Sequence, residues 1–389
     1  MQLSSDKKQA LNQLVKWFRS NYKRGNYITL GGYAGTGKTT LIAILRRIIF
    51  LKNKKINIAF ASYTGKASQV LRNYLKQSNT FYKQDFVGTI HSLIYSPIVS
   101  TGGRITGWKK KDKIDYDLII IDEASMVSSD IWQDLRSYQI PIIAVGDHGQ
   151  LPPINDSFHL MDNPHLKLET IHRQAKKNPI IKVSIIARKK GIIPPKNYGR
   201  QVIKINQSNV QAQELAEELL NNYDPETMVL TGYNFSRKQL NQSIRNSLGF
   251  FEDKPEANDR VICLRNNHSK GIYNGMLGTI LSINQEDTDW YYAEIKMDNV
   301  ENPYQGLISI EQFQASKTLS YTQLRKKGLK GDLFDFGYAL TVHKAQGSQA
   351  KKVILFEQRF KQMDDEMWKR WLYTAVTRAE EELYIFGEG

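Results

Sequence analysis

A glycine-rich segment between an apolar run and a helix constrains the fold of this chain more than any other feature. Residues 32–39 have the sequence GYAGTGKT, a complete G-x-x-x-x-G-K-T, and they directly follow the apolar run YITL at 27–30. The pattern of residues 40–50 predicts a helix that continues from the glycines. In such a strand–loop–helix unit, backbone N–H groups and the helix N-terminus surround phosphate groups. The segment therefore predicts a nucleotide-binding α/β fold, against the alternative of a chance glycine loop.

The rest of the first third alternates short apolar runs with helical patterns. Gly, Pro or charged residues border each run, which is typical of buried strands. The expected strands are 27–30, 56–62, 116–121 and 141–146. The first helix carries its apolar residues on one face, namely Leu11, Leu14, Val15 and Phe18. This alternation predicts a parallel sheet with helices on both faces.

Charge and composition narrow the class of protein. The 389 residues predict two to four domains, and 54 Lys and Arg against 39 Asp and Glu give a formal charge of +15. A surplus of this size favours a polyanionic partner, either nucleic acid or an acidic membrane surface. Cys263 is the only cysteine, so we expect a reducing compartment rather than a disulfide-stapled secreted scaffold. The first residues lack the apolar core of a signal peptide, and no run approaches the roughly 18 apolar residues of a membrane helix.

Two interruptions break the α/β pattern. Residues 95–115 contain a Gly-Gly turn between two short β-prone runs and then a run of lysines, which predicts a hairpin inserted between two strands. Residues 178–245 return to α/β character, with helices expected at 178–190, 210–222 and 236–248 and a strand at 227–231. Short strands divided by Gly, Asn and Asp fill 259–313 and predict a small antiparallel barrel. Strand-rich α/β character resumes at 335–345, 352–356 and 382–386.

Two adjacent carboxylates end the expected strand 116–121. Asp122 and Glu123 open the sequence DEAS. A carboxylate at the carboxyl end of a strand, beside a phosphate loop, suits a Walker-B ligand of Mg²⁺, and the adjacent acid can orient and deprotonate a water. An acidic turn after any strand is the alternative. Lys38 is expected to reach the β- and γ-phosphates and the Thr39 hydroxyl to bind Mg²⁺.

Several further motifs occur in a fixed order, and together they carry a family resemblance. They are Gln9 in the first helix, the phosphate loop 32–40, ASYTGKA (61–67), GTIHSLI (88–94), DEAS (122–125), GDHGQLPPI (146–154), LETIHRQ (168–174), LTVHKAQGSQ (340–349) and YTAVTRA (373–379). On these motifs the chain resembles superfamily 1 helicases of the subfamily containing RecD and the Dda helicase of T-even phages. Residues 258–278 also look similar to barrel openings in RecD-like proteins.

The resemblance implies a nucleotide site with contributions from several motifs. Gln9 would contact the adenine edge, although it could instead complete a helix cap with Asp6. Gln150 would lie by the attacking water or the γ-phosphate, and its alternative is a polar surface loop. The phosphate loop would bind through Gly35, Thr36, Gly37, Lys38, Thr39 and Thr40. Arg173 and Arg378 would be arginine fingers, the second supplied by the second motor domain.

The same resemblance implies a path for DNA. Thr64, Lys66, His91, Thr341 and His343 would lie along it or couple it to ATP, although both histidines could be ordinary packed side chains. The hairpin lies where the family carries its separation pin. Its wedge would be Trp108, or Tyr95 in second place, and the alternative is that Trp108 anchors the hairpin. Aromatics with Lys and Arg suit single-stranded nucleic acid. Further candidates are Lys109, Lys110, Lys111, Tyr291 and Tyr292, with a solvated lysine face and barrel core as the alternatives.

The expected protein is thus an ATP-dependent DNA helicase with two RecA-like α/β motor domains. Residues 1–170 form the first, with the hairpin inserted. Residues 171–258 and 335–389 form the second, with an SH3-like β-barrel at 259–334. ATP and Mg²⁺ are the expected cofactors, and neither the family nor the sequence offers a zinc site. The alternatives are a DNA or RNA translocase without strand separation, and a basic binding protein with an ATP switch.

The resemblance also sets expectations for partners and location. We expect a monomer that acts on single-stranded and forked duplex DNA, moves 5′ to 3′, and works with replication or single-strand-binding proteins, away from membranes. The expected location is the cytoplasm of a bacterial cell, or of the host if the chain is phage-encoded.

Overall fold

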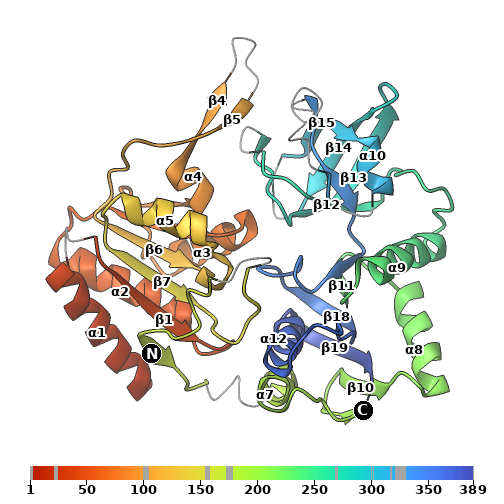
Figure 1. Cartoon of the computed structure of the whole chain (residues 1–389), viewed down its shortest axis with the longest axis horizontal. Helices are drawn as coiled ribbons and strands as arrows, with labels where there is room; N and C mark the ends of the chain where they lie inside the picture. Colours follow the sequence, from red (N-terminus) through yellow and green to blue (C-terminus); the bar gives the residue numbers. More distant parts are fainter. Residues whose placement is uncertain are drawn as a thin grey trace. The chain divides into compact units, whose positions relative to one another are not determined.

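The computed structural model describes most of the chain. The described residues are 3–21, 25–99, 105–153, 158–171, 178–267, 270–298, 300, 302–315, 318–319 and 330–388. The chain divides into two compact units: the first contains Met1–Ile98 and Gly107–Ile181, and the second contains Val99–Thr106 and Lys182–Gly389. Figure 1 shows the elements of both units.

A parallel sheet of six strands forms the centre of the first unit, in the order β3-β2-β6-β7-β1-β8. The strands are β1 (Tyr27–Gly32), β2 (Ile58–Ser62), β3 (Phe86–Thr89), β6 (Leu118–Asp122), β7 (Ile142–Gly146) and β8 (Leu166–Leu168). The helices are α1 (Ser5–Asn21), α2 (Lys38–Lys52), α3 (Gly65–Gln77), α4 (Ile90–Ile94) and α5 (Ser129–Ser137), with a 3₁₀ turn η1 (Ala124–Met126). The four strands expected in this region are confirmed, and β3 and β8 are additional.

Alternate strand residues point to opposite faces of this sheet, and each face has its own core. Ile58 and Phe60 pack in a cluster with apolar residues of α1, α2 and α3. Ala59 and Ala61, their neighbours on the same strand, pack in a second cluster with residues of α4 and α5. Both faces of the sheet are therefore buried, which explains why its strands are continuous apolar runs.

The hairpin expected within 95–115 is present as the two-stranded sheet of β4 (Tyr95–Val99) and β5 (Ile105–Lys110). Its turn, residues 100–104, lies outside the described residues. The chain enters β4 directly from α4 and leaves β5 toward β6. The hairpin is therefore an insertion between β3 and β6 in the chain order, and its strands do not belong to the six-stranded sheet.

A second six-stranded sheet, in the order β17-β11-β18-β19-β10-β9, lies in the second unit. All its pairs are parallel except β9 with β10. The strands are β9 (Lys196–Asn197), β10 (Val202–Asn206), β11 (Thr227–Thr231), β17 (Ala339–Thr341), β18 (Ala350–Phe356) and β19 (Ala379–Gly387). The helices are α7 (Pro179–Lys190), α8 (Val210–Asn221), α9 (Asn234–Ser247) and α12 (Asp365–Val376). The three helices and the strand expected within 178–248 are confirmed.

An antiparallel sheet of five strands, in the order β15-β14-β13-β12-β16, completes the second unit. Its elements are β12 (Arg260–Cys263), β13 (Leu277–Gln285), β14 (Trp290–Met297), β15 (Tyr304–Ser309), α10 (Ile310–Gln314) and β16 (Phe334–Phe336). Its outer strand β15 also bonds to Asp332, two residues before β16 begins: Asp332 N donates to Leu307 O (2.8 Å), and Ser309 N donates to Asp332 O (3.1 Å). The sheet therefore curls until its two ends meet.

The strand-rich stretch 335–345 belongs to two sheets. β16 pairs with β12 in the antiparallel sheet, whereas β17 pairs with β11 in the parallel sheet. One hydrophobic core runs through both sheets and includes Cys263, whose thiol pKa burial raises to about 12. Within the described ranges, no helix is long and apolar enough to cross a bilayer.

Candidate active site

The phosphate loop connects β1 to α2 through two glycines in the left-handed region of the backbone, Gly35 (φ 76°) and Gly37 (φ 79°). Such φ values favour glycine, and they let the chain turn sharply into the helix. α2 then begins at Lys38, whose Nζ donates to the carbonyl oxygens of Gly32 (2.6 Å) and Tyr33 (3.2 Å). The ammonium group is therefore held against the loop whose N–H groups can bind phosphate.

The other hydroxyl groups of the loop have different positions. Thr36 is fully buried and donates to Tyr33 O (2.7 Å), while the Thr40 hydroxyl lies 2.7 Å from the Tyr74 hydroxyl of α3. The Thr36 hydroxyl is thus used within the loop and the Thr40 hydroxyl in a contact between α2 and α3, so the backbone N–H groups of both residues are what they offer to a phosphate. Thr39, between Lys38 and Thr40 in the first turn of α2, is half-buried.

The two carboxylates lie at the carboxyl end of β6, the edge of the sheet on which β1 also ends. Asp122 pairs in register with Ser62 of β2, and its Oδ1 accepts from Glu123 N (3.0 Å). Burial and the adjacent Glu123 charge raise the pKa of Asp122 to about 7, while the positive charge of Lys38 opposes the rise. Lys38, Asp122 and Glu123 are therefore close enough to form one electrostatic cluster.

Two features of Glu123 destabilise the folded protein: the conformation of its backbone and the surroundings of its carboxylate. Its backbone is left-handed (φ 55°, ψ 39°), which typically costs about 1–3 kcal/mol for a residue other than glycine. Its Oε2 is buried and has no hydrogen-bond partner within the part of the chain that the structure describes. The same holds for Oε1 of Gln150, which follows the end of β7 and is 5% exposed. Buried oxygens without partners are rare in folded proteins and mark places where water or a ligand is accepted.

The donors at this edge fit Mg²⁺. The Thr39 hydroxyl and the Asp122 carboxylate are hard oxygen ligands, which are the kind that Mg²⁺ prefers. Burial and the neighbouring Glu123 charge raise the pKa of Asp122, and a divalent cation at this position would supply positive charge that favours the ionised carboxylate.

Two further expected nucleotide residues have less support from the geometry. Gln9 is exposed on α1. Asp6, on the same helix, accepts from Lys7 N (2.9 Å) and from Thr170 N (3.0 Å), so α1 is attached to the LETIHRQ motif. Arg173 of that motif lies outside the described residues.

Arg378 is buried inside the second unit, directly before β19, and is 3% exposed. Its guanidinium group donates to Thr374 O (2.9 Å), Ser348 O (3.1 Å) and Thr377 Oγ1 (3.1 Å). Through Ser348 it joins the end of α12 to the motif at 340–349. In this arrangement the guanidinium group stabilises its own unit.

The residues expected on the DNA path of the first unit lie at the carboxyl ends of β2 and β3. Thr64 is the N-cap of α3, where its hydroxyl accepts from Ala67 N (3.2 Å), and Lys66 lies in the first turn of that helix. Burial lowers the pKa of His91, whose ring lies near those of Tyr63 and Tyr95. The His91 ring is thus half-buried among aromatic rings at this edge.

In the second unit, Thr341 is the buried last residue of β17, and burial lowers the pKa of His343 two residues later. Burial and the charge of Arg237 lower the pKa of Lys344. Arg237, on α9, forms a buried ion pair with Asp335 of β16 (3.0 Å). The motif at 340–349 therefore begins beside a charged cluster that ties the two sheets together.

The hairpin and barrel candidates separate into exposed and buried residues. Trp108 on β5 is 39% exposed, and Tyr292 on β14 is 46% exposed. Tyr291 and its neighbour Trp290 are buried core residues, which supports the core interpretation for them. The lysine run is not a uniform solvated face, because burial lowers the pKa of Lys111 and its Nζ donates to Ser92 O and Leu93 O.

Sequence reasoning missed a ring contact beside the phosphate loop. Tyr33 of the loop and His148 after β7 have ring centroids 4.2 Å apart. At Gly31, a Cβ atom would clash with the ring of Pro164 and come within 2.8 Å of His148 Nδ1, so a glycine is required there. Asp147, in the same GDHGQ segment, is 1% exposed and accepts from Gly149 N (2.9 Å). The motif predicted a loop near the nucleotide but not these contacts.

Two family models match the chain. An AAA domain matches residues 12–193, and a UvrD-like helicase C-terminal domain matches residues 336–386. Among curated relatives, the ATP-dependent RecD2 DNA helicase of Deinococcus radiodurans is 24% identical, covering 92% of this chain and 47% of its own length. The RecD subunit of the RecBCD enzyme of Buchnera aphidicola is also 24% identical, covering 92% of this chain and 69% of its own length. The chain thus spans about half the length of the first of these relatives.

Solved structures share the fold. Pif1 from Bacteroides in complex with ADP-AlF3 and ssDNA has a TM-score of 0.54 at 19% identity, covering 99% of this chain and 92% of that chain. A Pif1 structure described as the basis of DNA unwinding at forked dsDNA has a TM-score of 0.55 at 20% identity, with the same coverage. Two parallel RecA-like sheets, an antiparallel sheet and a phosphate loop define a P-loop α/β fold, and this fold is the one that the chain shares with those structures. In sequence the chain is similar to RecD-type DNA helicases, and in fold it is similar to the solved Pif1 structures.

Proposed function

We propose that this protein is an ATP-dependent DNA helicase that moves 5′ to 3′ on single-stranded DNA and separates duplex DNA with its hairpin. The cluster of Lys38, Asp122 and Glu123 carries the proposal, because its buried carboxylate oxygen without a partner suits a group that accepts a proton from water. A nucleotide switch that only binds ATP has no need of that oxygen. The charge of +15 and the RecD2 DNA helicase among the relatives favour DNA as the polyanion.

Each residue of the cluster has a distinct task. Lys38 places its ammonium group on the β- and γ-phosphates, and the glycines bind the same groups through backbone N–H. Thr39 and Asp122 hold Mg²⁺, which neutralises phosphate charge when bound. Glu123 orients a water and accepts its proton, and Gln150 contacts that water or the γ-phosphate through its amide. Gln9 contacts the adenine.

We place single-stranded DNA over the motifs at 61–67, 88–94 and 340–349, with contributions from Thr64, Lys66, His91, Thr341 and His343. ATP binding and hydrolysis then change the relation between the two motor domains and move the strand. We assign residues 259–334 to an SH3-like barrel, and we expect a monomer that meets forked DNA and replication or single-strand-binding proteins. A translocase that does not separate strands is the alternative.

Forked DNA substrates test direction and strand separation together. With ATP and Mg²⁺, we expect unwinding of a duplex that carries only a 5′ single-stranded tail and little unwinding of one that carries only a 3′ tail. Strand release on a native gel is the measurement. A blunt duplex and an RNA strand of the same sequence are the controls. Preference for the 3′ tail contradicts the direction, and ATPase stimulated by single strands without strand release would favour the translocase.

Replacing Arg378 tests its role as an arginine finger. Arg378→Ala is expected to lower kcat by about 10³-fold or more with little change in ATP affinity, because a finger stabilises charge that develops during transfer. To act in this way the guanidinium group must leave its bonds to Thr374, Ser348 and Thr377. The measurements are DNA-stimulated ATPase and equilibrium binding of a fluorescent ATP analogue.

A control separates this role from the structural one. Thr377→Ala removes one acceptor of the guanidinium group and leaves the arginine in place. We expect a modest loss of thermal stability and near-normal kcat from this variant. If Arg378→Ala lost ATP affinity and kept kcat, the finger assignment would be wrong.

A further inference from the structure

One carboxylate of the first unit holds both strands of the hairpin. Asp134 lies on α5. Its Oδ2 accepts from the hydroxyl of Tyr95, the first residue of β4, and its Oδ1 accepts from Nζ of Lys110, the last residue of β5, at 3.0 Å. Lys110 Nζ also donates to Ser137 Oγ (3.1 Å) on the same helix. Both ends of the ribbon are therefore fixed to α5 at one point.

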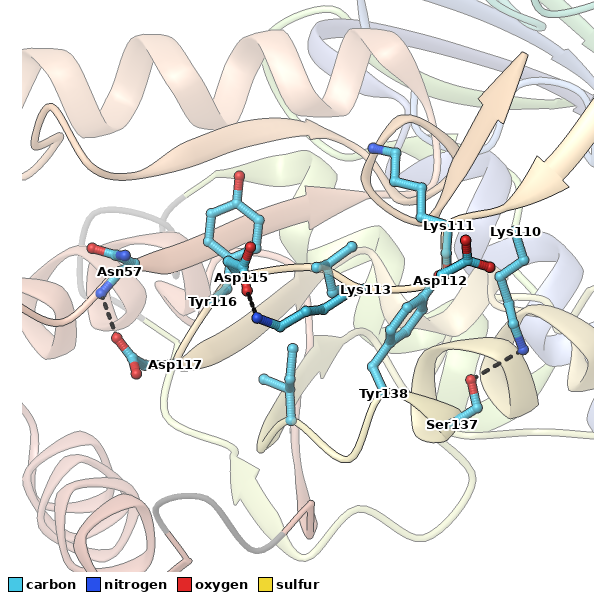
Figure 2. Close-up of a pocket in the computed structure, with 12 residues that line it drawn as sticks. Asn57, Lys110, Lys111, Asp112, Lys113, Asp115, Tyr116, Asp117, Ser137 and Tyr138 are labelled. Atoms are coloured by element: carbon cyan, nitrogen blue, oxygen red, sulfur yellow. Dashed lines mark hydrogen bonds and ion pairs between the residues drawn. The ribbon is translucent and has the colours of Figure 1, made fainter. Parts of the chain in front are cut away.

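A second group of bonds closes the base of the ribbon just beyond this carboxylate. Lys111 N donates to Ile94 O (2.8 Å), and the Tyr138 hydroxyl lies 3.0 Å from Ile94 O and 2.7 Å from Lys111 O. Figure 2 shows Lys110, Lys111, Ser137 and Tyr138 along one groove at this position. The residues that enter and leave the hairpin are thus bonded to each other and to a single tyrosine.

The two contacts of Asp134 differ in how strongly they attach the hairpin to α5. The hydrogen bond from Tyr95 lowers the pKa of Asp134, with a further contribution from Lys110. Burial and the same hydrogen bond raise the pKa of Tyr95. The side chains of Lys110 and Asp134 are 39% and 31% exposed, and an ion pair this exposed stabilises little by itself. The charge-assisted bond from the tyrosine hydroxyl is therefore the stronger part of the attachment.

A hairpin needs such an attachment to act as a wedge. An isolated two-stranded ribbon is marginally stable at best. A motor that pulls one strand past a ribbon separates the duplex only if the ribbon resists being pushed aside. Otherwise the motor must wait for the base pairs to open thermally, and its rate then depends on the stability of the duplex.

We propose that Asp134 is a positioning residue for strand separation, which fixes the root of the hairpin through Tyr95 and Lys110. The proposal rests on the proposed helicase function. It adds Asp134, a residue of α5 outside the nucleotide site, to the residues that serve this function. It also changes the role of Tyr95, which serves as an anchor rather than as a second candidate for the wedge. Trp108, farther along β5 and partly exposed, remains the candidate that meets the base pair.

The test compares unwinding with translocation in Tyr95→Phe and Asp134→Ala. On GC-rich forks we expect unwinding to fall about tenfold, which is the shift in equilibrium that one hydrogen bond to a charged group is typically worth. Single-strand-stimulated kcat and translocation rate are expected to stay within about twofold of the parent protein. On AT-rich forks the loss should be smaller, because a loosened wedge leaves the motor dependent on thermal opening. Asp112→Ala, which removes an exposed carboxylate near the hairpin, is the matched control and should unwind normally.

The outcomes separate this proposal from the proposed function. Equal losses of ATPase, translocation and unwinding in Tyr95→Phe would overturn it, since they indicate a general structural defect. Normal unwinding of GC-rich forks by both variants would also overturn it. Replacing residues 100–105 with a short turn tests the wedge itself. If that variant loses unwinding while Tyr95→Phe does not, the hairpin separates strands without Asp134. If neither loses unwinding, the hairpin has no part in strand separation.

Discussion

Lys38→Ala is expected to abolish ATP turnover while the protein remains folded. The Lys38 ammonium is held against the phosphate loop by Gly32 O and Tyr33 O, and it is the positive charge that opposes the rise in the pKa of Asp122. Its removal takes a cation from the β- and γ-phosphates and leaves the two carboxylates less compensated. Loss of one preorganised electrostatic group typically costs about 10²–10³ in kcat, and the added repulsion increases the loss. Single-strand-stimulated phosphate release is the measurement.

The matched control lies at the other end of the same helix. Lys52 is the exposed last residue of α2. Lys52→Ala removes the same side chain from the same helix and is expected to keep normal ATPase activity. Because Lys38 bonds only to carbonyls of the loop among the contacts described for it, the melting temperature of Lys38→Ala should stay close to that of the parent protein. Near-normal ATPase in the folded variant would overturn the assignment of the site.

The parts of the fold that sequence predicts well are those with a strong local cause. The strands at 58–62, 118–122 and 142–146 are buried on both faces, so they are continuous apolar runs that differ from their surroundings. The phosphate loop needs left-handed glycines at fixed spacing, and the sequence displays them directly. Local sequence and tertiary structure agree at these places, which is why the prediction succeeds.

Two strands of the first unit that the sequence did not predict have weaker local signals. β3 has four residues, of which two are buried, and β8 has three, of which one is buried, so neither forms a recognisable apolar run. Both are edge strands of the sheet, and their pairing depends on the strands beside them rather than on their own composition. Such strands become visible only when the neighbouring strands are in place.

Side-chain partners far apart in sequence were the hardest to predict. Nothing near Tyr95 indicates that its hydroxyl bonds to Asp134, and the lysine run gives no sign that Lys111 donates to the end of α4. The motif YTAVTRA indicates an arginine of interest but not that Arg378 is buried among carbonyl groups of its own unit. A motif predicts the kind of residue a site needs, whereas its present contacts depend on tertiary packing.

Glu123→Gln is expected to bind ATP and hydrolyse it about 10²–10⁴-fold more slowly, which is the usual cost of losing a general base. Glutamine has almost the same size, so the left-handed backbone and the burial at this position are kept. The substitution also removes a negative charge beside Asp122, which lowers the pKa of Asp122 and leaves it better able to hold a cation. ATP affinity should therefore be unchanged or higher while kcat falls, and equilibrium binding of an ATP analogue with single-turnover hydrolysis measures the two separately.

Replacing the neighbouring carboxylate, Asp122, should impair nucleotide binding rather than hydrolysis. Comparing the two variants therefore tests Asp122 as the Mg²⁺ ligand and Glu123 as the general base. Asp122→Asn removes the expected Mg²⁺ ligand, so its defect should appear in Mg²⁺-dependent nucleotide binding and shrink as Mg²⁺ is raised. The Glu123→Gln defect should not respond to Mg²⁺, because the variant lacks a proton acceptor rather than a ligand. Gln150→Ala offers a third comparison, since its Oε1 is also buried and has no hydrogen-bond partner among the described residues. An ordinary kcat in Glu123→Gln together with a large loss in Gln150→Ala would show that water is activated from the β7 side of the site rather than from Glu123.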